Sequence, residues 1–178
     1  VVTKLIAAGA DVNKARTDDG CTPLYIAAQE GHLTVVTKLI AAGADVDKAR
    51  TSDGSTPLYI AAQNGHLAVV TKLIAAGALV DKAATDDGAT PLYIAAQSGH
   101  LAVVTKLIAA GADVNKARTT DGGTPLLIAA QKGHLAVVTK LIAAGADVNK
   151  ETTEGCTPLY FAAQEGHLTV VTKLIAAG

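Results

Sequence analysis

Trp, Met and Phe are nearly absent from this sequence. Among its 178 residues there is no Trp, no Met and a single Phe, and aromatic residues make up only 3%. Ala, Leu, Val and Ile must therefore fill the hydrophobic core. Cysteine is scarce as well. Cys21 and Cys156 are too few for a disulfide framework and lack the spacing of metal ligands, so we expect two free thiols.

An excess of charge of one sign is missing too. The formal net charge is −1, which argues against a protein that coats nucleic acid or an anionic membrane surface. No apolar run reaches the roughly 18 residues of a membrane-spanning helix. No targeting signal is seen, because the apolar string at residue 1 recurs along the chain. A cytoplasmic location is the default expectation.

What the sequence does contain is an internal repeat. The string Thr-Pro-Leu begins at Thr22, Thr56, Thr90, Thr124 and Thr157, in steps of 34, 34, 34 and 33 residues. A constant period of this size indicates stacked supersecondary units. We predict one domain over residues 1–178, made of a partial unit 1–16 followed by units 17–50, 51–84, 85–118, 119–151 and 152–178.

Each unit is predicted to hold two short helices and a loop. Thr22 is a good N-cap and Pro23 suits the first helical turn. Gly31 can adopt the left-handed conformation that ends this helix. A second apolar helix follows at once and ends near Gly43, so the two helices should lie antiparallel. The following Ala-Asp-Val and Asp-Gly strings are typical of a projecting turn.

These strings resemble the ankyrin-repeat family. Thr-Pro-Leu-Tyr-Ile-Ala-Ala, Gly-His-Leu and Gly-Ala-Asp-Val-Asn together match its pattern over the whole chain. The resemblance implies an all-α helix-turn-helix solenoid with projecting loops or β-hairpins, curved so that the first helices line the concave side. It also implies a protein-binding module without catalysis. The chain departs from the family pattern where a His is usual, at Tyr25, Tyr59, Tyr93, Leu127 and Tyr160.

No motif in the sequence predicts catalysis. One histidine recurs per unit, but rungs separated by a stacking distance of about 8–10 Å cannot share one zinc ion, whose ligands lie about 2 Å from the metal. We therefore interpret these residues as structural, bonded to backbone: His32, His66, His100, His134 and His167. We predict no enzyme activity and no catalytic, cofactor or metal site, since every polar group recurs in equivalent places.

One lysine also recurs in every second helix. A nucleic-acid contact is one interpretation, and a solvated face is the other. We favour the solvated face, because no aromatic residues are interleaved and the twelve aspartates lie in the neighbouring loops. The row is Lys4, Lys38, Lys72, Lys106, Lys140 and Lys173.

Two positions differ between copies, although VVTKLIAAG is the same in all six. One precedes the turn between the two helices, and the other precedes Thr-Pro-Leu. We expect both to face the concave, loop-side surface. The predicted partner-binding residues are Ser55, Asn64, Ala89, Ser98, Gly123 and Lys132, with Tyr59, Tyr93 and Leu127 beside them. The single substitutions Leu79, Ala84 and Leu127 are expected to add a small apolar patch.

Two functions fit these patterns. The first is a non-enzymatic scaffold that binds a protein partner through its concave face. The second is a designed or consensus repeat protein with a structural role and no cognate partner, because the copies are so nearly identical. In either case the last helix, 168–177, carries the apolar stripe Leu168, Val171 and Ile175 with no following unit to cover it. This arrangement predicts weak head-to-tail self-association.

Overall fold

The computed structural model describes residues 1–178, apart from the side chain of Val2. It contains α1 (Val2–Ala7) and five helix pairs, and no strand is found in the described chain. The inner helices are α2 (Pro23–Gln29), α4 (Pro57–Gln63), α6 (Pro91–Gln97), α8 (Pro125–Gln131) and α10 (Pro158–Gln164). The outer helices are α3 (Leu33–Ala41), α5 (Leu67–Ala75), α7 (Leu101–Ala109), α9 (Leu135–Ala143) and α11 (Leu168–Ile175).

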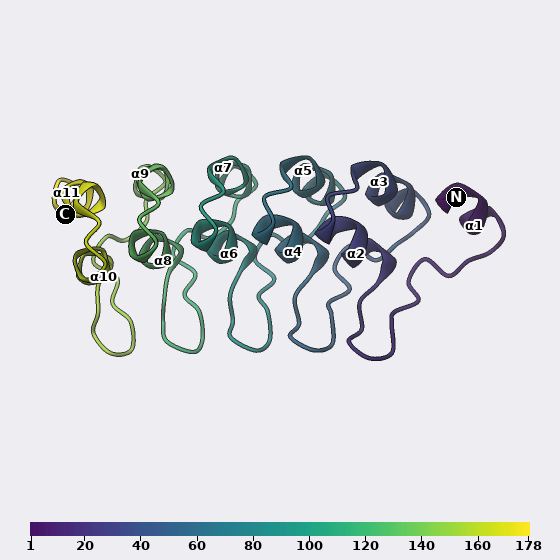
Figure 1. Cartoon of the computed structure of the whole chain (residues 1–178), viewed down its shortest axis with the longest axis horizontal. Helices are drawn as coiled ribbons and strands as arrows, with labels where there is room; N and C mark the ends of the chain where they lie inside the picture. Colours follow the sequence, from purple (N-terminus) through teal and green to yellow (C-terminus); the bar gives the residue numbers. More distant parts are fainter.

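The helices form two parallel rows (Figure 1). Each outer helix packs on the inner helix of its own unit, and both pack on their counterparts in the next unit. The loops between units project on the side of the inner helices, and the outer row arches gently over them (Figure 1). The two termini lie at opposite ends of the array. The predicted all-α solenoid is therefore confirmed.

The inner helices begin where the sequence predicts. The hydroxyl oxygen of Thr90 accepts a hydrogen bond from the backbone N–H of Tyr93 at 3.1 Å, and Pro91 occupies the first turn. This cap satisfies one of the N–H groups that a helix start leaves without an intrahelical partner. At the other end, Gly99 has a φ of 76°, in the left-handed region that favours glycine. The chain can then reverse into α7 with His100 as its N-cap.

The core runs along the interior of the stack and consists of small and branched aliphatic side chains. In the middle unit Leu92 and Ala96 of α6 meet Val104 and Leu107 of α7, and all four are fully buried. Alanine at the helix contacts lets neighbouring helices approach closely. Each unit buries its apolar faces only against the units beside it, which is the defining property of a solenoid.

The histidines join neighbouring units. Nε2 of His66 donates to the backbone carbonyl of Gln29 in the preceding unit at 2.9 Å, and Nε2 of His100 donates to that of Gln63 at 3.0 Å. His134 and His167 make the same bond one and two units further on. The interpretation of structural, backbone-bonded histidines is confirmed for these four, and the structure adds that the bond crosses between units.

The loops are also linked from unit to unit. The backbone N–H of Thr85 donates to the carbonyl of Asp53 at 2.8 Å, and that of Thr119 donates to Asp87 at 2.9 Å. Within each loop one bond closes a hairpin-like turn, for example from the N–H of Arg50 to the carbonyl of Ser55 at 2.9 Å. The loops therefore stack as turns with regular backbone contacts, which repeat from unit to unit.

The last unit leaves apolar side chains uncovered, as expected. Leu168 is 75% exposed and Ile175 is 65% exposed. Val171 is half-buried, whereas its equivalents Val104 and Val138 in covered units are 0% exposed, so the expectation holds for Val171 as well. Cys21 and Cys156, both free, lie in the first and the last complete units.

Candidate interaction surface

Four of the nine predicted partner-binding residues are accessible. Asn64 and Lys132 are exposed, and Ser98 and Tyr59 are half-buried. Asn64, Ser98 and Lys132 occupy the same position at the C-terminal caps of α4, α6 and α8. The stacking of units therefore brings these three different side chains into one row, as the sequence predicts.

The other five predicted contact residues are buried, so the expectation that they face the surface was wrong. Ser55 and Ala89 are 1% exposed, Tyr93 is 3% exposed and Leu127 is 4% exposed, and Gly123 is buried as well. The position before Thr-Pro-Leu is enclosed by its own loop and by the inner helix of the preceding unit. Ser55 shows why: its hydroxyl donates to Asp53 Oδ1 at 2.7 Å and lies 3.0 Å from the hydroxyl of Tyr25 in the preceding unit.

The expected apolar patch does not form. Leu79 is 58% exposed, in the linker that follows α5, whereas Ala84 and Leu127 are 5% and 4% exposed. Ala84 and Leu127 are enclosed by the stacked loops and helices, so three substitutions that look alike in sequence have separate surroundings. Leu79 remains an isolated exposed side chain.

A second row of exposed, differing residues lies at the tips of the loops. Asp18, Ser52, Asp86 and Thr120 occupy this position in four successive units, and all four are exposed. These four residues are not among the predicted partner-binding residues. The signal that could have found them is the same one that found Asn64, namely one position per unit at which the copies disagree. We call Asn64, Ser98 and Lys132 the cap row, and Asp18, Ser52, Asp86 and Thr120 the tip row. The two rows together are the variable face.

Beneath this face, arginine–aspartate pairs hold the loops. Arg50 donates from Nε to Oδ1 of Asp53 at 3.0 Å and from Nη2 to the other carboxylate oxygen. This bonding is the main cause that lowers the pKa of Asp53 to about 2, against the opposing effect of burial. The guanidinium carbon also lies 5.4 Å from the ring centroid of Tyr25, within cation–π range. Arg118 repeats the arrangement with Asp121 and with Tyr93, at 5.2 Å.

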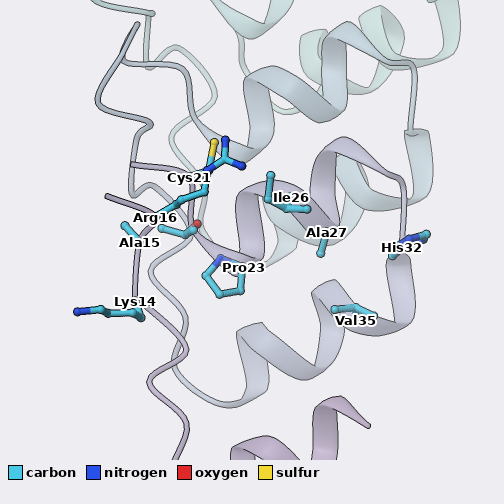
Figure 2. A pocket seen from close by; sticks show the side chains of 10 residues that line it. Lys14, Ala15, Arg16, Cys21, Pro23, Ile26, Ala27, His32 and Val35 are labelled. Carbon is cyan, nitrogen blue, oxygen red and sulfur yellow. The ribbon is translucent and has the colours of Figure 1, made fainter. Parts of the chain in front are cut away.

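A hollow of about 530 Å³ lies beside α2, where no inner helix of a preceding unit packs (Figure 2). Its wall is mostly apolar and includes Pro23, Ile26, Ala27 and Val35. The polar residues around it are Lys14, Arg16, Cys21, Thr22 and His32, and the side chain of Lys14 points away from it (Figure 2).

The thiol of Cys21 is the nucleophile nearest to this hollow. Burial, and then its bond to Asp19, raise the pKa of Cys21 to about 11. The thiol is therefore protonated at neutral pH, whereas a reactive cysteine needs a thiolate. Among the described side chains, no three His, Cys, Asp or Glu residues lie close enough to hold a metal ion.

A comparison with protein families agrees with this architecture. A family model described as ankyrin repeats (3 copies) matches residues 1–84, 49–118 and 115–178, which together span the chain. The chain belongs to the ankyrin-repeat family. A comparison with curated proteins gave no match.

Ankyrin repeats are generally protein–protein interaction modules, and the family is typically a non-enzymatic scaffold. The variable face of these ankyrin repeats is the surface on which the units differ. Family membership therefore makes it the candidate surface for contact with another protein. None of the described helices has the length and apolar character that a membrane crossing requires.

Proposed function

We propose that the chain is a non-enzymatic protein-interaction scaffold that binds its partner through the variable face, on the loop side of the arch. One observation carries the proposal. Asn64, Ser98 and Lys132 occupy equivalent, accessible places in successive units, yet they differ in size and charge while the packing residues around them do not. A solenoid can change such a row without disturbing its fold.

The outer helices present a surface that is less suited to specific recognition. The string VVTKLI is the same in α3, α5, α7, α9 and α11, so the surface they present repeats from unit to unit. A repeated surface offers a partner no unique register, because a shift by one unit presents the same groups again. Specific recognition therefore favours the loop side.

The buried members of the predicted set support this face from below. Ser55 bridges Asp53 and Tyr25, and Tyr93 lies under Arg118. They position the loops and are not expected to touch the partner. The alternative function, a designed or consensus repeat protein without a cognate partner, rests on the near-identity of the copies and predicts that no protein binds the variable face.

Matched substitutions on the two faces test the proposal. Ser98→Glu together with Lys132→Glu should weaken capture of the partner about tenfold or more, a loss typical of removing interface contacts. Lys106→Glu, on the outer helix α7, should leave capture unchanged. The assay compares proteins that the wild-type chain retains from a cell lysate with those that each variant retains.

Thermal unfolding provides the control, because all three side chains are accessible or half-buried and their loss should change stability little. If Lys106→Glu abolishes capture while the Ser98 and Lys132 variant retains it, the binding face is the outer one. If no protein distinguishes the variants, the alternative without a partner is favoured.

We also expect weak self-association of the 178-residue chain through its two ends. Leu168 and Ile175 at one end and Ile26 at the other are exposed apolar side chains. Each is more exposed than its equivalents inside the stack, for example Leu135, at 37%, Ile142 and Ile94. Light scattering should show a mean mass that rises with concentration, and Leu168→Glu should suppress the rise. A mass that stays monomeric to millimolar concentration would contradict this prediction.

A further inference from the structure

Three of the loops begin with an arginine, and in two of them, at Arg50 and Arg118, its side chain makes two kinds of contact. Arg50 binds the carboxylate of Asp53 through two nitrogens and covers the ring of Tyr25 in the preceding inner helix. Beneath that guanidinium, Tyr25 is 0% exposed. Arg118, Asp121 and Tyr93 form the same arrangement two units further on, and Tyr93 is 3% exposed.

Two loops of the stack lack this arginine. In the last loop Thr152 takes its place, and the inner helix before it has Leu127 where the others have a tyrosine. In the loop of residues 84–89 only the arginine is missing. The equivalent position is Ala84, and the tyrosine and carboxylate that would receive its side chain, Tyr59 and Asp87, are both retained. Tyr59 is half-buried, unlike the fully covered Tyr25 and Tyr93. The substitution therefore uncovers part of the tyrosine ring.

The carboxylate of Asp87 keeps the geometry of its counterparts. Its Oδ1 accepts a hydrogen bond from the N–H of Ala89 at 2.8 Å, as Oδ1 of Asp53 accepts one from Ser55 at 3.0 Å. Its Oδ2 has no arginine from its own loop. It accepts one long hydrogen bond, at 3.4 Å, from Nη1 of Arg118 in the next loop, whose guanidinium also binds Asp121.

The surroundings of Tyr59 are acidic. Burial first, and then the charges of Asp87, Asp86 and Asp53, raise the pKa of the Tyr59 hydroxyl. Asp86 is exposed at the loop tip. A positive group at this point would meet a carboxylate and the electron-rich face of a ring together.

We propose that Tyr59 and Asp87, on either side of Ala84, form an arginine-binding site, which takes the guanidinium of an arginine side chain on the partner protein. The incoming group occupies the place that Arg50 and Arg118 hold beside Tyr25 and Tyr93. This inference rests on the proposed function and deepens it, because it gives the chemistry of one partner residue.

The site favours arginine over lysine for a geometric reason. A guanidinium is planar, so it can lie against the tyrosine ring while two of its N–H groups bind the two carboxylate oxygens. A lysine ammonium is a compact, strongly hydrated charge that cannot do both in this way. Arg50 shows that a carboxylate and a tyrosine ring in this arrangement, here Asp53 and Tyr25, bind a guanidinium together.

A small probe tests the site without the partner. N-acetyl-arginine amide is titrated into ¹⁵N-labelled protein, and N-acetyl-lysine amide is titrated in parallel. We expect the arginine probe to shift the amide signals of Tyr59, Asp87 and Ala89, with severalfold smaller shifts for the lysine probe at the same concentration. Ala84→Arg fills the site from within and should abolish these shifts.

The chain also supplies a gain-of-site control. Arg50→Ala removes the guanidinium from Tyr25 and should create a second site, seen as new arginine-dependent shifts at Tyr25 and Asp53. Should Ala84→Arg fail to fold, Asp87→Asn replaces it and should reduce the Tyr59 shifts at least severalfold.

Three results would overturn the proposal: equal shifts with both probes, shifts spread over all loop aspartates, or unchanged Tyr59 shifts in the folded Ala84→Arg chain. None of these results would bear on the separate proposal that the partner binds the cap row. That function is tested separately by partner capture with the Ser98 and Lys132 variant, so the two proposals can fail independently.

Discussion

Replacing Leu107 by Ala should lower the free energy of unfolding by about 2–5 kcal/mol, the range for deleting a large buried aliphatic side chain. Leu107 lies in α7, in the middle of the stack, and is 0% exposed. Its neighbours are held by units on both sides, so they can relax only partly into the cavity. Chemical denaturation monitored by circular dichroism measures the change.

The same substitution at two other sites shows whether position in the stack matters. Leu79→Ala, at a side chain that is 58% exposed, should change stability by no more than about 0.5 kcal/mol. Leu174→Ala removes a buried side chain from the last helix, α11, which has only one neighbouring unit. We expect it to loosen that unit and to cost less than Leu107→Ala. Equal costs at Leu107 and Leu174 would contradict a nearest-neighbour stack.

Gly99→Ala should destabilise the chain by about 2–5 kcal/mol, as the sum of two costs. An L-residue in the left-handed region costs about 1–2 kcal/mol, and Gly99 has a φ of 76°. A Cβ atom at this position would also lie 2.8 Å from Cε1 of His134 in the next unit, and overpacking of this kind costs about 1–3 kcal/mol. Thermal or chemical unfolding gives the total.

Gly166 is the matched control. Its φ is 75°, yet a Cβ atom there would meet nothing within 4 Å. Gly166→Ala should therefore show only the backbone cost. Combining Gly99→Ala with His134→Ala should cost less than the sum of the two single substitutions, because removal of the ring removes the clash along with the bond to the carbonyl of Gln97. If the two glycine variants are equally destabilised, the contact between Gly99 and His134 does not have the geometry described.

The helix arrangement could be predicted from the sequence because its signals are local. Thr90 and Pro91 mark a helix start and Gly99 marks an end within one unit, and the constant period then determines the stack. Small differences remain at the ends. The second helix of the first full unit, expected to end near Gly43, ends at Ala41, and the last helix ends at Ile175 instead of Ala177.

Burial in the loops could not be predicted in the same way. Within its own unit Ser55 has the sequence of an ordinary loop residue, and it is Tyr25, thirty positions earlier, that helps to enclose it. The effect of Ala84 is likewise invisible in one unit, because the residue that it uncovers, Tyr59, belongs to the preceding helix. Variation between copies identified positions that differ, but it could not show which of them reach the surface.

The central claim is that the loop side of the arch binds a protein partner. Hydrogen exchange of the chain, alone and with the captured partner, tests it most directly. The account predicts slower exchange in the loops and inner-helix ends of residues 51–64, 85–98 and 119–132, and no change in α5, α7 and α9. Protection confined to those outer helices would contradict it.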